Sequence, residues 1–228
     1  MPSEFLQNQN NPMYKGDPEK NFIQGRDLIF PPTQQEILNK ALEIEDEETK
    51  ALYCLLYESG QRISEALKMK FGNLKEVSYN HHRFIEVTSI TLKNRKQAMR
   101  VIPIPQFIPI EVQIFAYFNQ IYQHRTGEIF MNQYSRNAVA NKFRNITFNL
   151  EVLDFQKREK SMREVRLHPH LLRHFRLTHL VQLYHYSAFQ LKQFAGWSSV
   201  LPATVYVNLE SSDLANQFAQ NFKFNKKS

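Results

Sequence analysis

The stretch His170-Leu171-Leu172-Arg173-His174 decides how this chain is interpreted. Residues three positions apart share one face of a helix, so His170 and Arg173 place an imidazole beside a guanidinium. Such a pair suits an anion, because Arg carries a permanent charge and both groups can donate hydrogen bonds. His170 and His174 are also spaced like helical metal ligands. No acidic residue lies between them and no third ligand stands out, so the sequence favours an anion site without a metal.

A second arginine lies far upstream, in Glu58-Ser59-Gly60-Gln61-Arg62-Ile63-Ser64-Glu65. Gly60 ends one predicted helix and Arg62 begins the next. Glu65 follows one turn later and can hold the Arg62 guanidinium in place. Taken alone, the two residues are better interpreted as an exposed ion pair that contributes little.

Two aromatic residues follow the histidine-rich helix. Gly196-Trp197-Ser198-Ser199 ends a short predicted helix, and Tyr206 lies ten residues after Gly196. A tyrosine hydroxyl can act as a nucleophile, and an indole N–H can donate one hydrogen bond. Trp197 is the single tryptophan of the chain and could also be a core aromatic.

A β-hairpin is predicted in the sequence between Arg62 and Arg173. Residues 84–92 read as a strand, 94–98 as a polar turn, and 99–104 as the antiparallel partner. Pro103 suggests an edge strand or a strand end. Lys93 and Lys96 lie at the mouth of this hairpin, where the plain alternative is that they are solvent-facing turn residues.

In this order, the arginine, the hairpin lysine, the His-x-x-Arg-His run, Gly-Trp and the tyrosine resemble the tyrosine recombinase (phage integrase) family. The stretch after Gly60 is similar to the first arginine box of that family, and Arg100-Val101-Ile102-Pro103 matches the residues that follow its catalytic lysine. Trp197 takes the place of a commoner histidine. The resemblance covers about residues 33–210.

The resemblance implies a mechanism. Tyr206 would attack a DNA phosphate and form a 3′-phosphotyrosyl bond, and Lys93, or Lys96 as the alternative, would protonate the leaving 5′ oxygen. The groups that would bind the non-bridging oxygens are Arg62, His170, Arg173 and Trp197. Glu65 and His174 would support them. No metal, ATP or other cofactor is implied.

The resemblance also implies a mainly α fold with a small antiparallel β-sheet, the fold of the family's catalytic domain. We expect residues 1–30 to be a flexible arm and residues 31–228 to be the catalytic domain, with no recognisable core-binding domain before it. Expected helices start after Thr33, with Glu36 closing a capping box, and run over residues 48–58, 63–70, 110–123, 136–150, 170–184 and 187–195. A last amphipathic segment is expected over residues 212–222.

The composition fits a polyanionic partner. The formal charge is +7 and the pI about 9.4, which favours double-stranded DNA. Cys54 reads as a buried small residue and excludes an internal disulfide. No signal segment or membrane-length apolar run is present, so we expect a cytoplasmic, nucleoid-associated protein with no membrane partner. The family assembles on DNA as tetramers, often by exchanging a C-terminal segment, for which residues 214–224 are the candidate.

Two other functions remain open from the sequence. The same active site serves type IB topoisomerase-like and telomere-resolving enzymes, which differ in their DNA products. A non-catalytic DNA-binding protein could also use the scaffold, although each expected catalytic position is filled here by a competent residue.

Overall fold

The structure, a computed structural model, describes residues 28–91, 98–123, 135–154 and 159–207. The helices are α2 (Gln34–Leu42), α3 (Glu47–Ser59), α4 (Ile63–Ala66), the 3₁₀ turn η2 (Phe71–Asn73), α5 (Pro109–Gln123), α6 (Arg136–Phe143), α7 (Pro169–Gln182), α8 (Ala188–Ala195) and α9 (Leu201–Val207). The strands are β1 (Leu28–Ile29), β2 (Leu74–Tyr79), β3 (His82–Thr91), β4 (Ala98–Pro105), β5 (Thr147–Asp154) and β6 (Glu159–Arg166). The mainly helical fold with small antiparallel sheets is as predicted.

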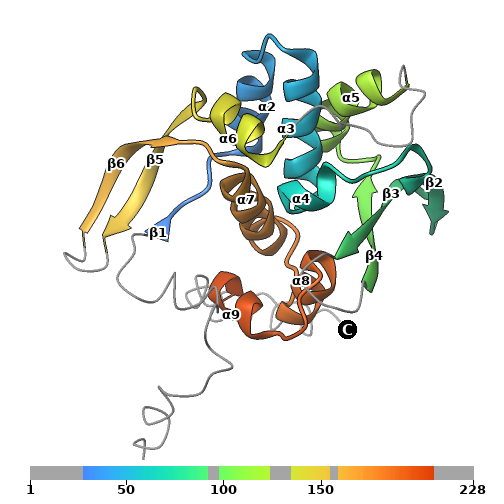
Figure 1. Cartoon of the computed structure of the whole chain (residues 1–228). Helices are drawn as coiled ribbons and strands as arrows, with labels where there is room; N and C mark the ends of the chain where they lie inside the picture. The colour runs from blue at the N-terminus through green and yellow to red at the C-terminus, as the bar shows by residue number, and fades with distance from the viewer. Residues whose placement is uncertain (1–27, 92–97, 124–134, 155–158, 208–228) are drawn as a thin grey trace, which may run out of the picture.

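Two helices, α3 and α7, form the centre of the molecule. Both are buried along almost their whole length, which is typical of helices covered on every side. Figure 1 shows α7 in the middle, with one sheet on each side and with α8 and α9 below it. α3 ends at Gly60, whose φ of 55° is the left-handed conformation that favours glycine at a helix end. α7 begins with Pro169 after His168, whose ring accepts from the Leu171 N–H.

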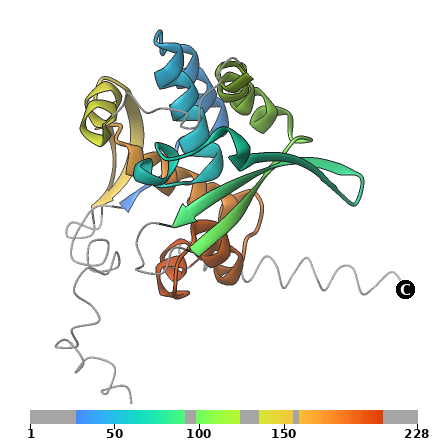
Figure 2. The ribbon, with the colours of Figure 1, turned by 45° about the vertical axis from the view of Figure 1, so that its right-hand side comes forward.

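Strands β2, β3 and β4 form one antiparallel sheet, and the predicted hairpin is its β3–β4 pair. β4 is an edge strand, as Pro103 indicated. The inward positions of the hairpin are buried and apolar until its open end, where Ser89 faces Arg100 across the strands. Figure 2 shows this end of the hairpin beside α8, which β4 contacts. The hairpin therefore extends from the core to the lower part of the molecule.

The second sheet, in the order β1-β5-β6, corrects two predictions. The helix expected over 136–150 ends at Phe143, and Thr147–Asp154 is a strand. Within it Phe148, Leu150 and Val152 alternate inward, which is the period of a strand and not of a helix. Leu28–Ile29, inside the stretch expected to be an arm, pairs antiparallel with β5. Pairing with β1 and β6 thus overrides the helical signal after residue 143.

Strands β2 and β6 and helix α9 were not predicted, whereas several other elements follow the predictions. Thr33 and Glu36 form the expected capping box, and Ser135 and Ser187 each cap a helix. The helix after Arg62 is shorter than expected, ending at Ala66. Cys54 is fully buried. The segments 212–222 and 214–224 lie outside the described residues. No helix in the described ranges has the length and apolar character needed to cross a membrane.

Candidate active site

Arg62 lies at the junction between α3 and α4, held by the buried carboxylate of Glu65. Glu65 Oε1 accepts from Arg62 Nη1 at 3.0 Å, and Oε2 accepts from the Arg62 backbone N–H at 3.0 Å. The Arg62 side chain is 23% exposed, whereas that of Glu65 is fully buried. Within the described part of the chain, Glu65 is the sole acceptor for the Arg62 side chain. Glu65 therefore holds one side of the Arg62 guanidinium, and the other N–H groups of Arg62 can donate to a ligand.

Arg173 is a buried arginine on α7 that ties three segments together. Its Nη1 donates to the Gly60 carbonyl at 2.6 Å and its Nη2 to the Ala195 carbonyl at 2.9 Å. Burial, followed by the charges of Arg62 and Arg100, lowers the pKa of Arg173 to about 9. It therefore stays protonated at neutral pH, and the nearby carboxylate of Glu65 only partly offsets its repulsion from the other guanidiniums.

Trp197 lies against Arg173, and Tyr206 lies against Trp197. The Arg173 guanidinium carbon is 5.6 Å from the Trp197 ring, and Trp197 stacks on Tyr206 with ring centroids 5.9 Å apart. The Tyr206 ring is also 5.5 Å from that of His174. Tyr206 belongs to α9, a helix that the sequence analysis did not predict. The chain from Gly196 onward therefore turns back and places Tyr206 beside α7.

The hydroxyl of Tyr206 makes no hydrogen bond to any described residue. Burial raises the pKa of Tyr206 to about 12, and the charge of Arg173 offsets part of this rise. The phenol is therefore protonated at neutral pH and must lose its proton before it acts as a nucleophile.

The two histidines of the run differ in their surroundings. His174 is buried and its Nε2 lies 3.1 Å from the Ile29 carbonyl, so it links α7 to β1. His170 is exposed and makes no hydrogen bond to the described residues. Desolvation, then the charges of Arg173, His168 and Arg62, lower the pKa of His170. His170 is therefore a neutral imidazole at pH 7, able to donate one hydrogen bond and to accept one proton.

The structure thus brings Arg62, Glu65, Arg173, His174, Trp197 and Tyr206 into one connected group, with His170 electrostatically coupled to it. Lys93 and Lys96 lie outside the described residues. Arg100, quoted only as a motif residue, was missed as a member of the group. It reaches Glu65 Oε2 from β4 at 2.9 Å. The only local signal for it is a charged residue at an inward position of a strand.

The described group suits an oxyanion. Arg62 and Arg100 both bind the carboxylate of Glu65, and Arg173 binds two backbone carbonyls, so three guanidiniums face one carboxylate. Preorganised donors of this kind stabilise charge on a phosphate. Among the residues with described positions, no cluster of three His, Cys, Asp or Glu side chains could hold a metal ion.

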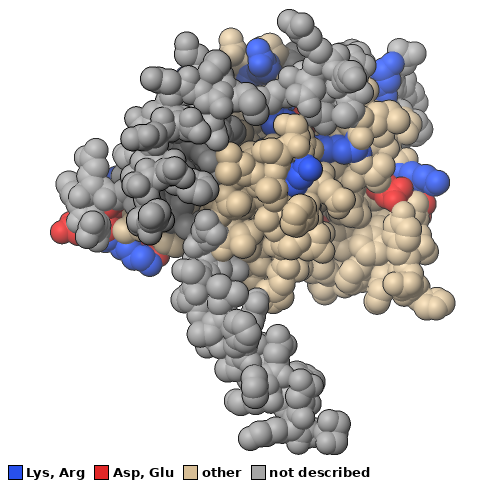
Figure 3. All heavy atoms as spheres, turned by 90° about the horizontal axis from the view of Figure 1, so that it is seen from below, with Lys and Arg blue, Asp and Glu red and all other residues tan. Residues whose placement is uncertain are grey.

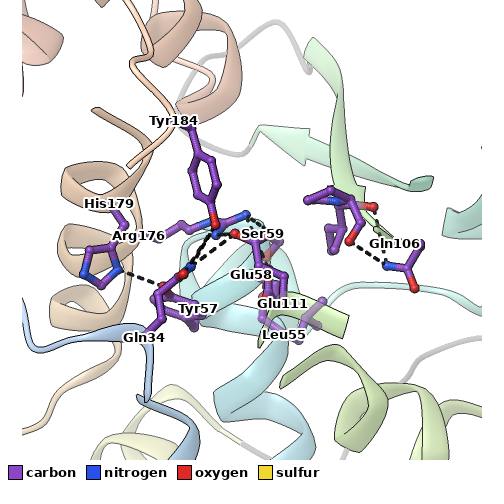
Figure 4. Close-up of polar contacts among 12 residues, drawn as sticks. Gln34, Leu55, Tyr57, Glu58, Ser59, Gln106, Glu111, Arg176, His179 and Tyr184 are labelled. Atoms are coloured by element: carbon purple, nitrogen blue, oxygen red, sulfur yellow. Dashed lines mark hydrogen bonds and ion pairs between the residues drawn. The ribbon is translucent and has the colours of Figure 1, made fainter. Parts of the chain in front are cut away.

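A second charged cluster is buried around Arg176 of α7 (Figure 4). Arg176, one turn after Arg173, is bidentate on Glu111 of α5 and lies 3.3 Å from Glu58 of α3. Burial, then the negative charge of Glu111, raises the pKa of Glu58 well above its usual value. Burial opposes ionisation of Glu111, but the charge and hydrogen bonds of Arg176 lower its pKa. Glu58 therefore resists ionisation, whereas the Arg176–Glu111 pair favours its charged form.

The comparisons with known proteins agree with the fold. A model described as the phage integrase family matches residues 29–212. A search of curated proteins found no match. The XerH site-specific recombinase bound to difH substrate has a TM-score of 0.55 at 16% identity, over 81% of this chain and 51% of XerH.

Two other solved structures are less similar. The XerA recombinase has a TM-score of 0.49 at 17% identity, over 84% of this chain and 64% of XerA. The Tn1549 transposon integrase in complex with circular intermediate DNA has a TM-score of 0.47 at 16% identity, over 78% and 62%. The present chain thus spans about half the length of the XerH chain.

The fold is that of a tyrosine recombinase catalytic domain. With most of its length matched by the family model, the chain belongs to the phage integrase family.

Proposed function

We propose that this chain is a site-specific DNA recombinase or integrase, which cuts and rejoins double-stranded DNA through a 3′-phosphotyrosyl intermediate. The single observation that carries the proposal is the placement of Tyr206. Its ring stacks on Trp197, which in turn contacts the buried Arg173. A nucleophile beside a guanidinium-rich oxyanion site is an arrangement suited to attack on a phosphate.

In the proposed reaction, the phenolic oxygen of Tyr206 bonds to the scissile phosphorus while the bond to the 5′ oxygen breaks. The phenolic proton passes to water or to the neutral ring of His170. Arg62, Arg173, His170 and Trp197 donate to the non-bridging oxygens. Because a phosphodiester replaces a phosphodiester, rejoining is the reverse of the same step and needs neither ATP nor a metal.

Lys93 is proposed as the acid that protonates the leaving 5′ oxygen, with Lys96 as the alternative. β3 ends at Thr91 and β4 begins at Ala98, and Arg100 ties the start of β4 to Glu65. This open end of the hairpin therefore lies next to the site. The variants Lys93→Ala and Lys96→Ala distinguish the two, since only the loss of the true acid blocks cleavage of an ordinary phosphate.

The net charge of the chain and its similarity to a solved structure support DNA as the proposed partner. Figure 3 shows the molecule from below. On this face, basic side chains lie in the middle as well as near the edges, whereas acidic side chains lie mainly near the edges. The net charge of +7 has the sign that DNA binding requires. XerH, a similar structure with a TM-score of 0.55, is a site-specific recombinase bound to difH substrate. We assign catalysis to residues 31–228, with β1 joined to that unit through β5, and propose a tetramer on DNA.

Covalent capture of DNA tests the proposal. Cells expressing the wild-type chain or Tyr206→Phe are lysed in strong detergent, and DNA linked to the protein is precipitated and sequenced. We expect adducts only with the wild type, clustered at one sequence and accompanied by exchanged junctions. Adducts with relaxed circles or hairpin ends alone would instead indicate a topoisomerase or a telomere resolvase, and equal backgrounds would contradict catalysis by Tyr206.

A further inference from the structure

Arg100 is a buried charge on the inner face of β4. Only 8% of the residue is exposed, and its register partner on β3 is Ser89, which is also buried. The next inward positions of the strand, Ile102 and Ile104, are apolar and fully buried. Burying a guanidinium is costly unless its N–H groups are satisfied. The contacts of the two Nη groups offset this cost in part, whereas Nε has no hydrogen-bond partner among the described residues.

Both terminal nitrogens of Arg100 are engaged by parts of the active site. Nη2 donates to Glu65 Oε2 at 2.9 Å, and Nη1 donates to the Phe194 carbonyl. Glu65 Oε1 meanwhile accepts from Arg62 Nη1 at 3.0 Å. One carboxylate therefore connects Arg100 to Arg62, and a change at Arg100 reaches Arg62 through it.

The contact with Phe194 connects Arg100 to the other half of the site. Phe194 and Ala195 are the last two residues of α8, and their carbonyls belong to the set that a helix end leaves without internal partners. Arg100 donates to the Phe194 carbonyl, and Arg173 donates to the Ala195 carbonyl. The end of α8, two residues before Trp197, is thus bound by two arginines that come from different elements.

We propose that Arg100 is a positioning residue, which acts through Glu65 to fix the Arg62 guanidinium and through the end of α8 to align Arg173 and Trp197 around one oxyanion. Arg173 lies against Trp197 beside Tyr206, whereas the contacts of Arg100 lead to Glu65 and to the end of α8, so we assign Arg100 no direct contact with that oxyanion. The inference deepens the proposed function and rests on it only in taking the oxyanion to be a DNA phosphate.

Orthovanadate provides a probe that needs no DNA sequence. Its binding to the full chain is measured by isothermal titration calorimetry for the wild type, Arg100→Met and Arg83→Met. Arg83 lies in the same sheet, but its side chain is 70% exposed, so its variant is the matched control. We expect Arg100→Met to weaken binding about tenfold, or about 1.4 kcal/mol, and Arg83→Met to leave it unchanged. Wild-type affinity in Arg100→Met, or no binding by the wild type, would overturn the proposal.

A double-mutant cycle with Glu65→Gln separates positioning from a simple loss of charge. If Arg100 acts through Glu65, Arg100→Met should weaken orthovanadate binding much less in the Glu65→Gln background. An equal loss of orthovanadate affinity in both backgrounds would mean that Arg100 acts only through its positive charge, and would overturn the proposal. Should Arg100→Met fail to fold, Arg100→Lys replaces it. The ammonium cannot span both acceptors, so reduced affinity is expected and unchanged affinity would again overturn it.

The proposed function can fail separately. If orthovanadate binding follows this pattern while covalent capture of DNA does not depend on Tyr206, Arg100 positions an oxyanion site and the recombinase assignment is wrong.

Discussion

The ring of Tyr206 stacks on the indole of Trp197, with centroids 5.9 Å apart and ring planes inclined by 23°. Trp197 is the sole tryptophan, so its fluorescence reports directly on this contact. We expect Tyr206→Ala to shift the emission to longer wavelength, because the half-buried indole gains solvent. Tyr206→Phe keeps the ring and should leave the spectrum unchanged. Tyr79→Ala, at a tyrosine 53% exposed on β2, is the control. A shift with the control, or none with Tyr206→Ala, would contradict the stacking.

Substitution of Arg173 should destabilise the protein more than substitution of Arg62, although both residues serve the proposed reaction. Arg173→Ala leaves two carbonyls, of Gly60 and Ala195, without their donors, and we expect it to lower the free energy of unfolding by about 3 kcal/mol. Arg62→Ala should lower it by less than about 1 kcal/mol, because Arg62 is partly exposed and Glu65 keeps its bond to Arg100. Urea unfolding followed by circular dichroism measures both. Equal losses would mean that the carbonyl contacts of Arg173 contribute nothing to the fold.

The locally encoded features of the site were predictable from the sequence. The spacing of His170 and Arg173, the helix end at Gly60 and the turn before Arg62 each depend on a few neighbouring residues, and the structure contains them. The order of these motifs was sufficient to identify the family.

Features that depend on distant partners were not predictable. Thr147–Asp154 forms a strand because it pairs with β1 and β6, and neither partner had been predicted as a strand. Arg100 reaches acceptors 35 and 94 residues away along the chain. No local pattern specifies such a contact, so its role emerged only with the fold.

Substitution of Gly60 should destabilise the protein for two reasons. Its φ of 55° is strained for any other residue, and a Cβ there would lie 2.9 Å from Phe194 Cε1. We expect Gly60→Ala to lower the free energy of unfolding by about 1–2 kcal/mol and, because the Gly60 carbonyl holds Arg173, to weaken orthovanadate binding as well. Gly72→Ala is the matched control, since nothing lies within 4 Å of its Cβ position. The prediction is wrong if the two variants have the same unfolding midpoint.

Glu58 should make the protein less stable as the pH rises. Its folded pKa lies well above the ordinary value of 4.5, first because of burial and then because of Glu111. Above pH 4.5 the unfolded chain therefore releases a proton that the folded chain keeps, and the free energy of unfolding falls until the folded pKa is reached. Glu58→Gln cannot titrate. Its stability relative to the wild type should increase by up to about 1.4 kcal/mol per pH unit in this window.

The measurement is urea unfolding of the wild type and Glu58→Gln at pH 5, 6, 7 and 8. Histidines with lowered pKa values, such as His179, change stability in the opposite direction, but they are present in both proteins and cancel in the difference. Glu76→Gln, at a glutamate whose side chain is 72% exposed, should give a constant difference. If the Glu58→Gln difference is constant too, Glu58 is ionised in the folded protein, and the Arg176 cluster holds two carboxylate charges instead of one.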